Sequence, residues 1–136
     1  NTVLHLLAIA RESDIEYKIE NINKIADKVA HISKISPSKP DVHMDDVNRA
    51  GGVNAVMCEV SKRGNNLNLD ALMISGETLA ERIEGCEIQD SDIIHTNEDA
   101  YSQVGGLSIL FGNLATEGAV VKTAGITGNM KQFKGK

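Results

Sequence analysis

His5 and Glu12 are the first residues in this sequence whose types and spacing could serve chemistry. They lie seven residues apart, so in a helix they share one stripe and could face a polar cavity. A lone histidine in a largely apolar segment is more often a buried, hydrogen-bonded side chain than a catalytic base. The residues alone therefore favour a structural interpretation of His5.

Asp45 and Asp46 are adjacent carboxylates, the ligand type that Mg²⁺ and Ca²⁺ prefer. Adjacent residues of a helix point about 100° apart, so these two cannot jointly hold one cation. We expect them instead to stabilise the first turn of a helix by capping and through the helix dipole. Asp46 and Arg49, three residues apart, are expected to form a surface ion pair.

The two cysteines, Cys58 and Cys86, have neither the spacing of a disulfide framework nor that of a zinc site. We expect Cys58 to pack within a helix and Cys86 to lie in a loop. So few cysteines are typical of a reducing compartment, and we expect a cytoplasmic protein.

Two glycine-containing pairs, at residues 105–106 and 112–113, could bring backbone amides close to a ligand. No GxGxxG or GxxxxGK[ST] motif accompanies them, so turns are the favoured interpretation. The spacing of the residues thus predicts neither a catalytic constellation nor a metal site.

The composition of the sequence limits the class of protein and the kinds of partner that can be expected. The 136 residues carry a formal net charge of −5, are 41% hydrophobic and contain only 3% aromatic residues. These values are typical of one globular domain and argue against a nucleic-acid partner, which favours clustered Lys and Arg with stacking rings. The longest uncharged apolar run, residues 3–10, is far shorter than the ~20 residues of a membrane-spanning helix, so no membrane partner is expected.

The first half of the chain has helical patterning. Residues 3–12 are apolar nearly all round, which predicts a helix buried on several sides. A half-exposed amphipathic helix is predicted over roughly residues 20–33, followed by a proline loop at 36–40. Asp41 is then a plausible N-cap for a third helical stretch at residues 43–63.

Glycines divide the rest of this helical region. The pair Gly51–Gly52 is expected to split the third helical stretch, because glycine costs about 1 kcal/mol relative to alanine inside a helix. Residues 67–75 could hold a strand. Ser75 or Gly76 is expected to cap a further helix at residues 77–84.

The last third of the sequence changes character. Residues 89–103 are polar and charged, as in a linker. The runs 107–111 and 119–123 are typical of β-strands and predict a hairpin with a loop of about five residues. Helices first and strands second indicate an α+β class. Both ends are abrupt, so we expect a segment of a longer chain, with further strands of the sheet beyond Lys136.

Three stretches carry a specific resemblance: residues 1–8 (NTVLHLLA), 44–53 (MDDVNRAGGV), and 105–114 (GGLSILFGNL) together with 117–125 (EGAVVKTAG). They resemble the dihydroxy-acid dehydratases of branched-chain amino-acid biosynthesis, within the dihydroxy-acid/6-phosphogluconate dehydratase superfamily. The resemblance spans essentially the whole chain in the family's order and spacing. It implies an internal fragment of a much longer enzyme.

The resemblance also implies a reaction. Enzymes of this family dehydrate 2,3-dihydroxy acids to 2-oxo acids on the route to valine and isoleucine, with an iron-sulfur cluster and Mg²⁺. The family's cluster cysteines and most of its magnesium ligands lie upstream of the matching part, and its proposed base lies downstream. We therefore expect no catalytic residue, no metal ligand and no bound cofactor in this segment, which alone would be inactive. The full-length enzyme is expected to be a homodimer.

The family's architecture implies a domain layout. Residues 1–88 would be the last helical part of an N-terminal α/β domain, residues 89–104 a linker, and residues 105–136 the first strands of a β-rich swivelling domain. Asn1, Thr2 and His5 would border the substrate cleft, where a helix N-terminus favours a carboxylate. Gly51–Gly52 would serve close helix packing near the domain junction.

Two alternatives stay open at this point. A 6-phosphogluconate or aldonic-acid dehydratase shares the architecture and chemistry, although residues 47–52 (VNRAGG) favour the amino-acid branch. A stand-alone, non-catalytic scaffold domain could keep the same fold elements without the reaction.

Overall fold

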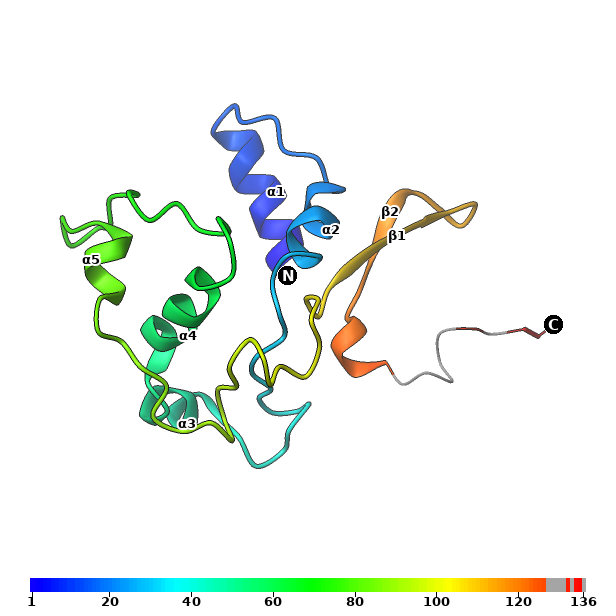
Figure 1. Ribbon diagram of the computed structural model, residues 1–136. Coiled ribbons are helices and arrows are strands. Elements are labelled where there is room, and N and C mark those ends of the chain that lie inside the picture. Colours follow the sequence, from blue (N-terminus) through cyan, green and yellow to red (C-terminus); the bar gives the residue numbers. More distant parts are fainter. Residues whose placement is uncertain (127–131, 133, 136) are drawn as a thin grey trace. The chain divides into compact units, whose positions relative to one another are not determined.

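The computed structural model describes residues 1–126, 132, 134 and 135 and contains, in that part of the chain, five α-helices followed by a two-stranded antiparallel sheet (Figure 1). This order confirms the α+β character expected from the sequence. The chain divides into two compact units. Unit 1 comprises residues 1–27 and the described residues from 105 onward, and unit 2 comprises residues 28–104. No helix among the described residues has the length and apolar character needed to cross a bilayer.

Helix α1, Thr2–Glu12, confirms the first predicted helix. It packs one stripe on the core of unit 1, where Val3, Ile22 and Ile109 are buried. The expected burial on several sides is wrong for this chain, because Leu4 is 67% and Ile9 is 61% exposed. Unit 1 has too few elements to cover more than one face of α1.

Helix α2 spans only Asn21–Ala26, much less than the predicted 20–33. Beyond it the backbone becomes extended, and isolated antiparallel bridges join His31 to Ser102 and Ser33 to Ile94. Ile32, between the two bridged residues, is buried in this extended conformation, which suits a β-branched side chain. Tertiary pairing therefore outweighs the helical spacing of the apolar residues here.

Strands β1, Ser108–Gly112, and β2, Ala115–Val121, confirm the predicted hairpin. Its turn lies at residues 113–114, so the expected five-residue loop is wrong. Gly118 lies inside β2 at φ +98°, and a Cβ there would approach the Ile109 and Phe111 side chains to about 3 Å. Gly118, which precedes the predicted strand at residues 119–123, is thus a close-approach position within β2. A 3₁₀ turn, Thr123–Gly125, follows the hairpin.

The expected β-rich region, residues 105–136, includes residues 127–131, 133 and 136, which lie outside the described residues.

Helices α3, Met44–Arg49, and α4, Gly52–Ser61, belong to unit 2 and confirm that the glycine pair splits the third helical stretch. Gly51 has φ +119°, and a Cβ there would lie 2.6 Å from both Ala55 Cβ and the Glu87 carbonyl oxygen. Only glycine fits both the backbone conformation and this close approach. The N-cap of α3 is His43, so the prediction of Asp41 as the cap is wrong.

The remaining part of unit 2 departs from the sequence predictions in two places. The expected strand at residues 67–75 is a series of turns with one isolated bridge, Leu72 to Thr78. Helix α5, Leu79–Ile83, is capped by Thr78, whose hydroxyl accepts a hydrogen bond from Glu81 N, and not by Ser75 or Gly76. Thr78 and Glu81 form a capping box that was present in the sequence as T-x-x-E.

The core of unit 2 gathers six buried residues from α3, α4 and two extended segments: Ala30, Ile32, Val47, Ala50, Ala55 and Ile94. Ile94 has no exposed surface, so residues 89–104, which were expected to be a linker, supply the most completely buried large side chain of the unit. The division into residues 1–88, 89–104 and 105–136 stays a prediction.

Candidate functional site

The three predicted substrate-binding residues lie at the N-terminal end of α1 in unit 1. Asn1 is the N-cap, and its carbonyl oxygen accepts a hydrogen bond from His5 N at 2.9 Å. The Asn1 side chain makes no capping hydrogen bond. Asn1, Thr2 and His5 are all exposed, so the structural interpretation of His5 as a buried histidine is wrong.

Thr2 borders an apolar cavity of about 240 Å³ within unit 1. The cavity is lined by residues of α1, the α1–α2 loop, α2 and the segment before β1: Thr2, Val3, Leu6, Tyr17, Ile22, Ile25, Ala26, Gly105, Gly106 and Leu107. Asn1 and His5 are not among them. This almost entirely apolar lining suits an apolar group.

Gly105 and Gly106 shape one side of this cavity. Gly105 N donates to the Ala26 carbonyl oxygen at 2.7 Å, and a Cβ on Gly105 would lie 3.2 Å from Ala26 Cα. A Cβ on Gly106 would lie 2.8 Å from Ala124 Cβ. The glycine pair therefore serves close backbone approach, in line with a structural rather than a phosphate-binding role.

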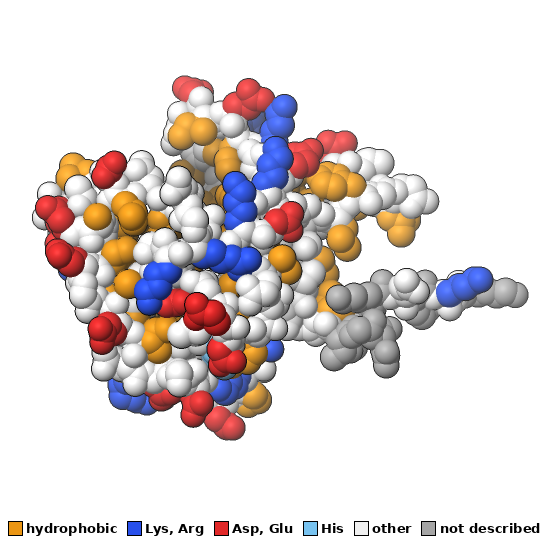
Figure 2. Space-filling view, viewed as in Figure 1, with side chains coloured by type: hydrophobic (Ala, Val, Ile, Leu, Met, Phe, Trp, Pro, Cys, Tyr) orange, Lys and Arg blue, Asp and Glu red, His pale blue; other side chains and the backbone are white. Residues whose placement is uncertain are grey.

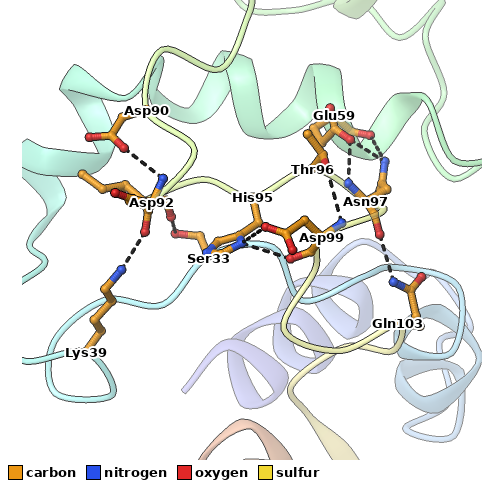
Figure 3. A network of polar contacts seen from close by, with 11 residues as sticks. Ser33, Lys39, Glu59, Asp90, Asp92, His95, Thr96, Asn97, Asp99 and Gln103 are labelled. Atoms are coloured by element: carbon orange, nitrogen blue, oxygen red, sulfur yellow. Dashed lines mark hydrogen bonds and ion pairs between the residues drawn. The ribbon is translucent and has the colours of Figure 1, made fainter.

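A polar centre surrounds Glu59 of α4 in unit 2 (Figure 3). The sequence analysis did not predict it. Glu59 is only 3% exposed. Its Oε1 accepts hydrogen bonds from Asn97 N at 2.8 Å and from Asn97 Nδ2 at 2.9 Å, and its Oε2 accepts one from Lys62 Nζ at 2.8 Å. Asn97 Nδ2 also donates to the Glu59 carbonyl oxygen at 2.6 Å.

Two opposing effects set the ionisation of Glu59. Burial favours the neutral acid and raises the pKa of Glu59, but the hydrogen bonds and charge of Lys62 together with the hydrogen bonds of Asn97 outweigh it. The net result is a Glu59 pKa below its ordinary value, while the Lys62 pKa is raised by the same pairing. The pair is therefore ionised at neutral pH.

A polar hollow of about 450 Å³ adjoins this pair and is lined by Glu59, Lys62, Arg63, Thr96, Asn97, Glu98 and Gln103. The signal for it in the sequence was Glu59, four residues after the buried Ala55 and thus on the same helical face. No buried side-chain nitrogen or oxygen among the described residues lacks a hydrogen-bond partner. The buried side-chain polar atoms around Glu59 are therefore all hydrogen-bonded.

A third group of residues gathers around Tyr101 in unit 2. His95 Nδ1 lies 3.0 Å from both the carbonyl oxygen and Oδ2 of Asp99 (Figure 3). The centre of the His95 ring lies 4.3 Å from that of the Tyr101 ring. Lys34 Nζ lies 4.2 Å above the centre of the Tyr101 ring, a cation–π contact. His95 is therefore paired with Asp99, and Lys34 with the Tyr101 ring, as is typical of side chains packed together at a protein surface.

The donor sets found do not fit an iron-sulfur cluster or a magnesium site. Within residues 1–126 and the other described positions, no three His, Cys, Asp or Glu side chains come together as metal ligands. Asp46 is engaged by His43 N at 2.7 Å and by Arg49, which confirms the predicted ion pair. Cys58 lies in α4 and Cys86 follows α5, as expected, and both are half-buried.

The sequence matches known protein families over nearly its whole length. Residues 1–82 match the family described as dihydroxy-acid/6-phosphogluconate dehydratase N-terminal, and residues 92–136 match its C-terminal counterpart. The dihydroxy-acid dehydratase of Sulfurimonas denitrificans is 68% identical over 99% of this chain. Those of Anaeromyxobacter sp. and Campylobacter hominis are 58% and 56% identical over the whole chain. The chain spans 24% of the length of each of these three relatives.

Proposed function

Because the chain belongs to the dihydroxy-acid/6-phosphogluconate dehydratase family, we propose that it is a segment of an enzyme that dehydrates 2,3-dihydroxy acids to 2-oxo acids. The observation that carries this proposal is the high identity, along the entire segment, to relatives named dihydroxy-acid dehydratase. The pathway implied is the biosynthesis of valine and isoleucine. The segment by itself is expected to be inactive, because its relatives are about four times as long.

The reaction breaks the C2–H and C3–O bonds of the substrate. The proton leaves C2 and hydroxide leaves C3, and the resulting enol rearranges to the 2-oxo acid. Hydroxide is a poor leaving group, so a base at C2 and an electrophile at the C3 oxygen lower the same barrier from opposite ends. The iron-sulfur cluster and Mg²⁺ of the intact enzyme belong to this proposal, and the family resemblance places their ligands in other parts of the polypeptide.

The proposed role of this segment is to connect two domains. Residues 1–88 would close an N-terminal α/β domain, residues 89–104 would cross over, and residues 105–136 would begin a β-rich domain. The separate matches to N-terminal and C-terminal family regions support this layout. The intact enzyme would be a cytoplasmic homodimer.

Asn1, Thr2 and His5 are proposed to border the substrate cleft. The first turn of α1, on which the Asn1 side chain makes no capping hydrogen bond, supports this. Uncapped backbone N–H groups and the positive end of the helix dipole attract a carboxylate such as that of a 2,3-dihydroxy acid.

The test uses the intact polypeptide that contains this segment, purified without oxygen and loaded with iron, sulfide and Mg²⁺. It is assayed for 2-oxo acid formation from a branched 2,3-dihydroxy acid and, in parallel, from 6-phosphogluconate. We expect turnover of the branched substrate. Preferential turnover of 6-phosphogluconate would shift the assignment to the sugar-acid branch, and failure to turn over either acid in the fully loaded protein would support a scaffold.

A further inference from the structure

The chain passes between the two units twice, after Asp27 and after Val104. Inside unit 2 the segments next to these two points run antiparallel. His31 N donates to the Ser102 carbonyl oxygen at 2.8 Å, and Tyr101 N donates to the His31 carbonyl oxygen at 3.0 Å. The incoming segment, residues 28–33, and the outgoing segment, residues 95–104, are therefore paired with each other.

Both segments are also bonded to one place, the carboxyl end of α4 and the turn after it. Asn66 Nδ2 donates to the Lys28 carbonyl oxygen at 3.2 Å, at the first residue of the incoming segment. Arg63 Nη1 donates to the Gln103 carbonyl oxygen at 2.8 Å, one residue before the end of the outgoing segment. Each crossing thus has a side-chain attachment within one residue of the point where the chain leaves unit 2.

Among Glu59, Arg63 and Asn66, Glu59 takes part in the most hydrogen bonds. It binds the outgoing segment through both the backbone N–H and the side-chain amide of Asn97. Gln103 Nε2 in turn donates to the Asn97 carbonyl oxygen at 2.9 Å, which closes residues 97–103 into a loop (Figure 3). A buried carboxylate with several charge-assisted hydrogen bonds is costly to disrupt, because breaking them leaves a desolvated charge.

We propose that Glu59, Arg63 and Asn66 form an anchor that fixes the two paired segments where the chain enters and leaves unit 2, with Glu59 bound to Asn97 as its central contact. The anchor is a conformational device of this chain and does not depend on the reaction proposed above. It predicts that the outgoing segment and its paired partner loosen together when the Glu59 contact is lost.

The experiment is hydrogen exchange read by mass spectrometry on the intact polypeptide at neutral pH. Glu59→Gln removes the charge and places an amide donor against Lys62. We expect exchange in residues 95–104 to accelerate at least about tenfold, with a smaller acceleration in residues 28–33 and no change in α5. Glu98→Gln is the matched control, because Glu98 lines the same hollow but is exposed, and it should leave exchange unchanged.

Asn97→Ala is the second variant, since it removes the side-chain half of the contact and leaves the Glu59–Lys62 pair intact. If the two residues act through one contact, the double variant should accelerate exchange little more than the stronger single variant. Unchanged exchange in residues 95–104, equal acceleration in α5, or effects that multiply in the double variant would each overturn the proposal.

Discussion

Asp46 shows how one side chain can define where a helix begins. Its carboxylate accepts a hydrogen bond from His43 N and pairs with Arg49 across the first turn of α3. The hydrogen bond from the His43 backbone is the main reason that the pKa of Asp46 lies below its ordinary value; the charges of Arg49 and His43 act in the same direction, and desolvation opposes them. The sequence predicted these capping and pairing roles from position alone.

Asp46→Asn should therefore destabilise α3 in a pH-dependent way. A carboxyl whose pKa is depressed by folding stabilises the native state above its unfolded pKa, here 3.8, and loses that contribution as the pH falls through the folded pKa. We expect faster hydrogen exchange in α3 at pH 7, and a difference from the parent protein that shrinks below pH 3.8. Asp45→Asn is the control. An equal effect of both substitutions, or a difference that persists in acid, would contradict this account.

His5 is the residue on which the proposed position of the substrate cleft can be tested. In the intact enzyme, His5→Ala should raise the KM or lower the turnover by about tenfold, the loss expected for one hydrogen bond to a charged group. Glu12→Gln, at the other end of α1, should leave both parameters unchanged. Steady-state kinetics on a branched 2,3-dihydroxy acid measure the effect, and unaltered kinetics for His5→Ala would remove His5 from the cleft.

At the scale of elements, the glycine break and the hairpin were predicted correctly, whereas the N-caps of α3 and α5, the length of the hairpin loop and the tertiary pairings were not. The Gly51–Gly52 break and the hairpin both follow from local chemistry, so the sequence predicted them. The early end of α2 depends on bridges to residues 94 and 102, which no local pattern reveals. Glu59 was missed for the same reason, because its partner Asn97 lies 38 residues away. The N-terminal site residues came from family resemblance and not from their own spacing.

Gly51 should be the least replaceable glycine of the helical region. Gly51→Ala places a Cβ 2.6 Å from the Glu87 carbonyl oxygen in a left-handed conformation, so we expect a loss of about 2–4 kcal/mol in the opening free energy of α3 and α4. Gly64→Ala is the matched control, because Gly64 has φ +64° but nothing within 4 Å of its Cβ position. It should cost only about 1 kcal/mol. Equal costs in native-state hydrogen exchange would show that the close approach is unimportant.

At the scale of the whole molecule, the described chain leaves much apolar surface uncovered (Figure 2). In unit 1 this surface includes Leu4 and Ile9 of α1, and Leu110, Phe111 and Leu114 of the hairpin, with Leu114 98% exposed. Apolar area of this kind favours association with other protein surfaces. A two-stranded sheet by itself is also marginally stable in water.

The 136-residue polypeptide should therefore self-associate or pack loosely when it is produced alone. Sedimentation velocity should detect species heavier than 14.6 kDa, and Leu114→Lys should reduce them. Thr116→Lys is the control, since it adds the same charge to an exposed position of β2 without removing apolar surface. A monomer with a sharp thermal transition would contradict this expectation.

The central claim is that these residues are the connecting segment of a longer dehydratase. It is tested most directly by the mass of the native polypeptide, captured from source cells with an antibody against this segment and measured intact by mass spectrometry. Since the chain covers 24% of its relatives' length, we predict a mass about four times 14.6 kDa, with additional cysteine-bearing peptides outside residues 1–136. A native mass near 14.6 kDa would contradict the claim and favour a non-catalytic scaffold.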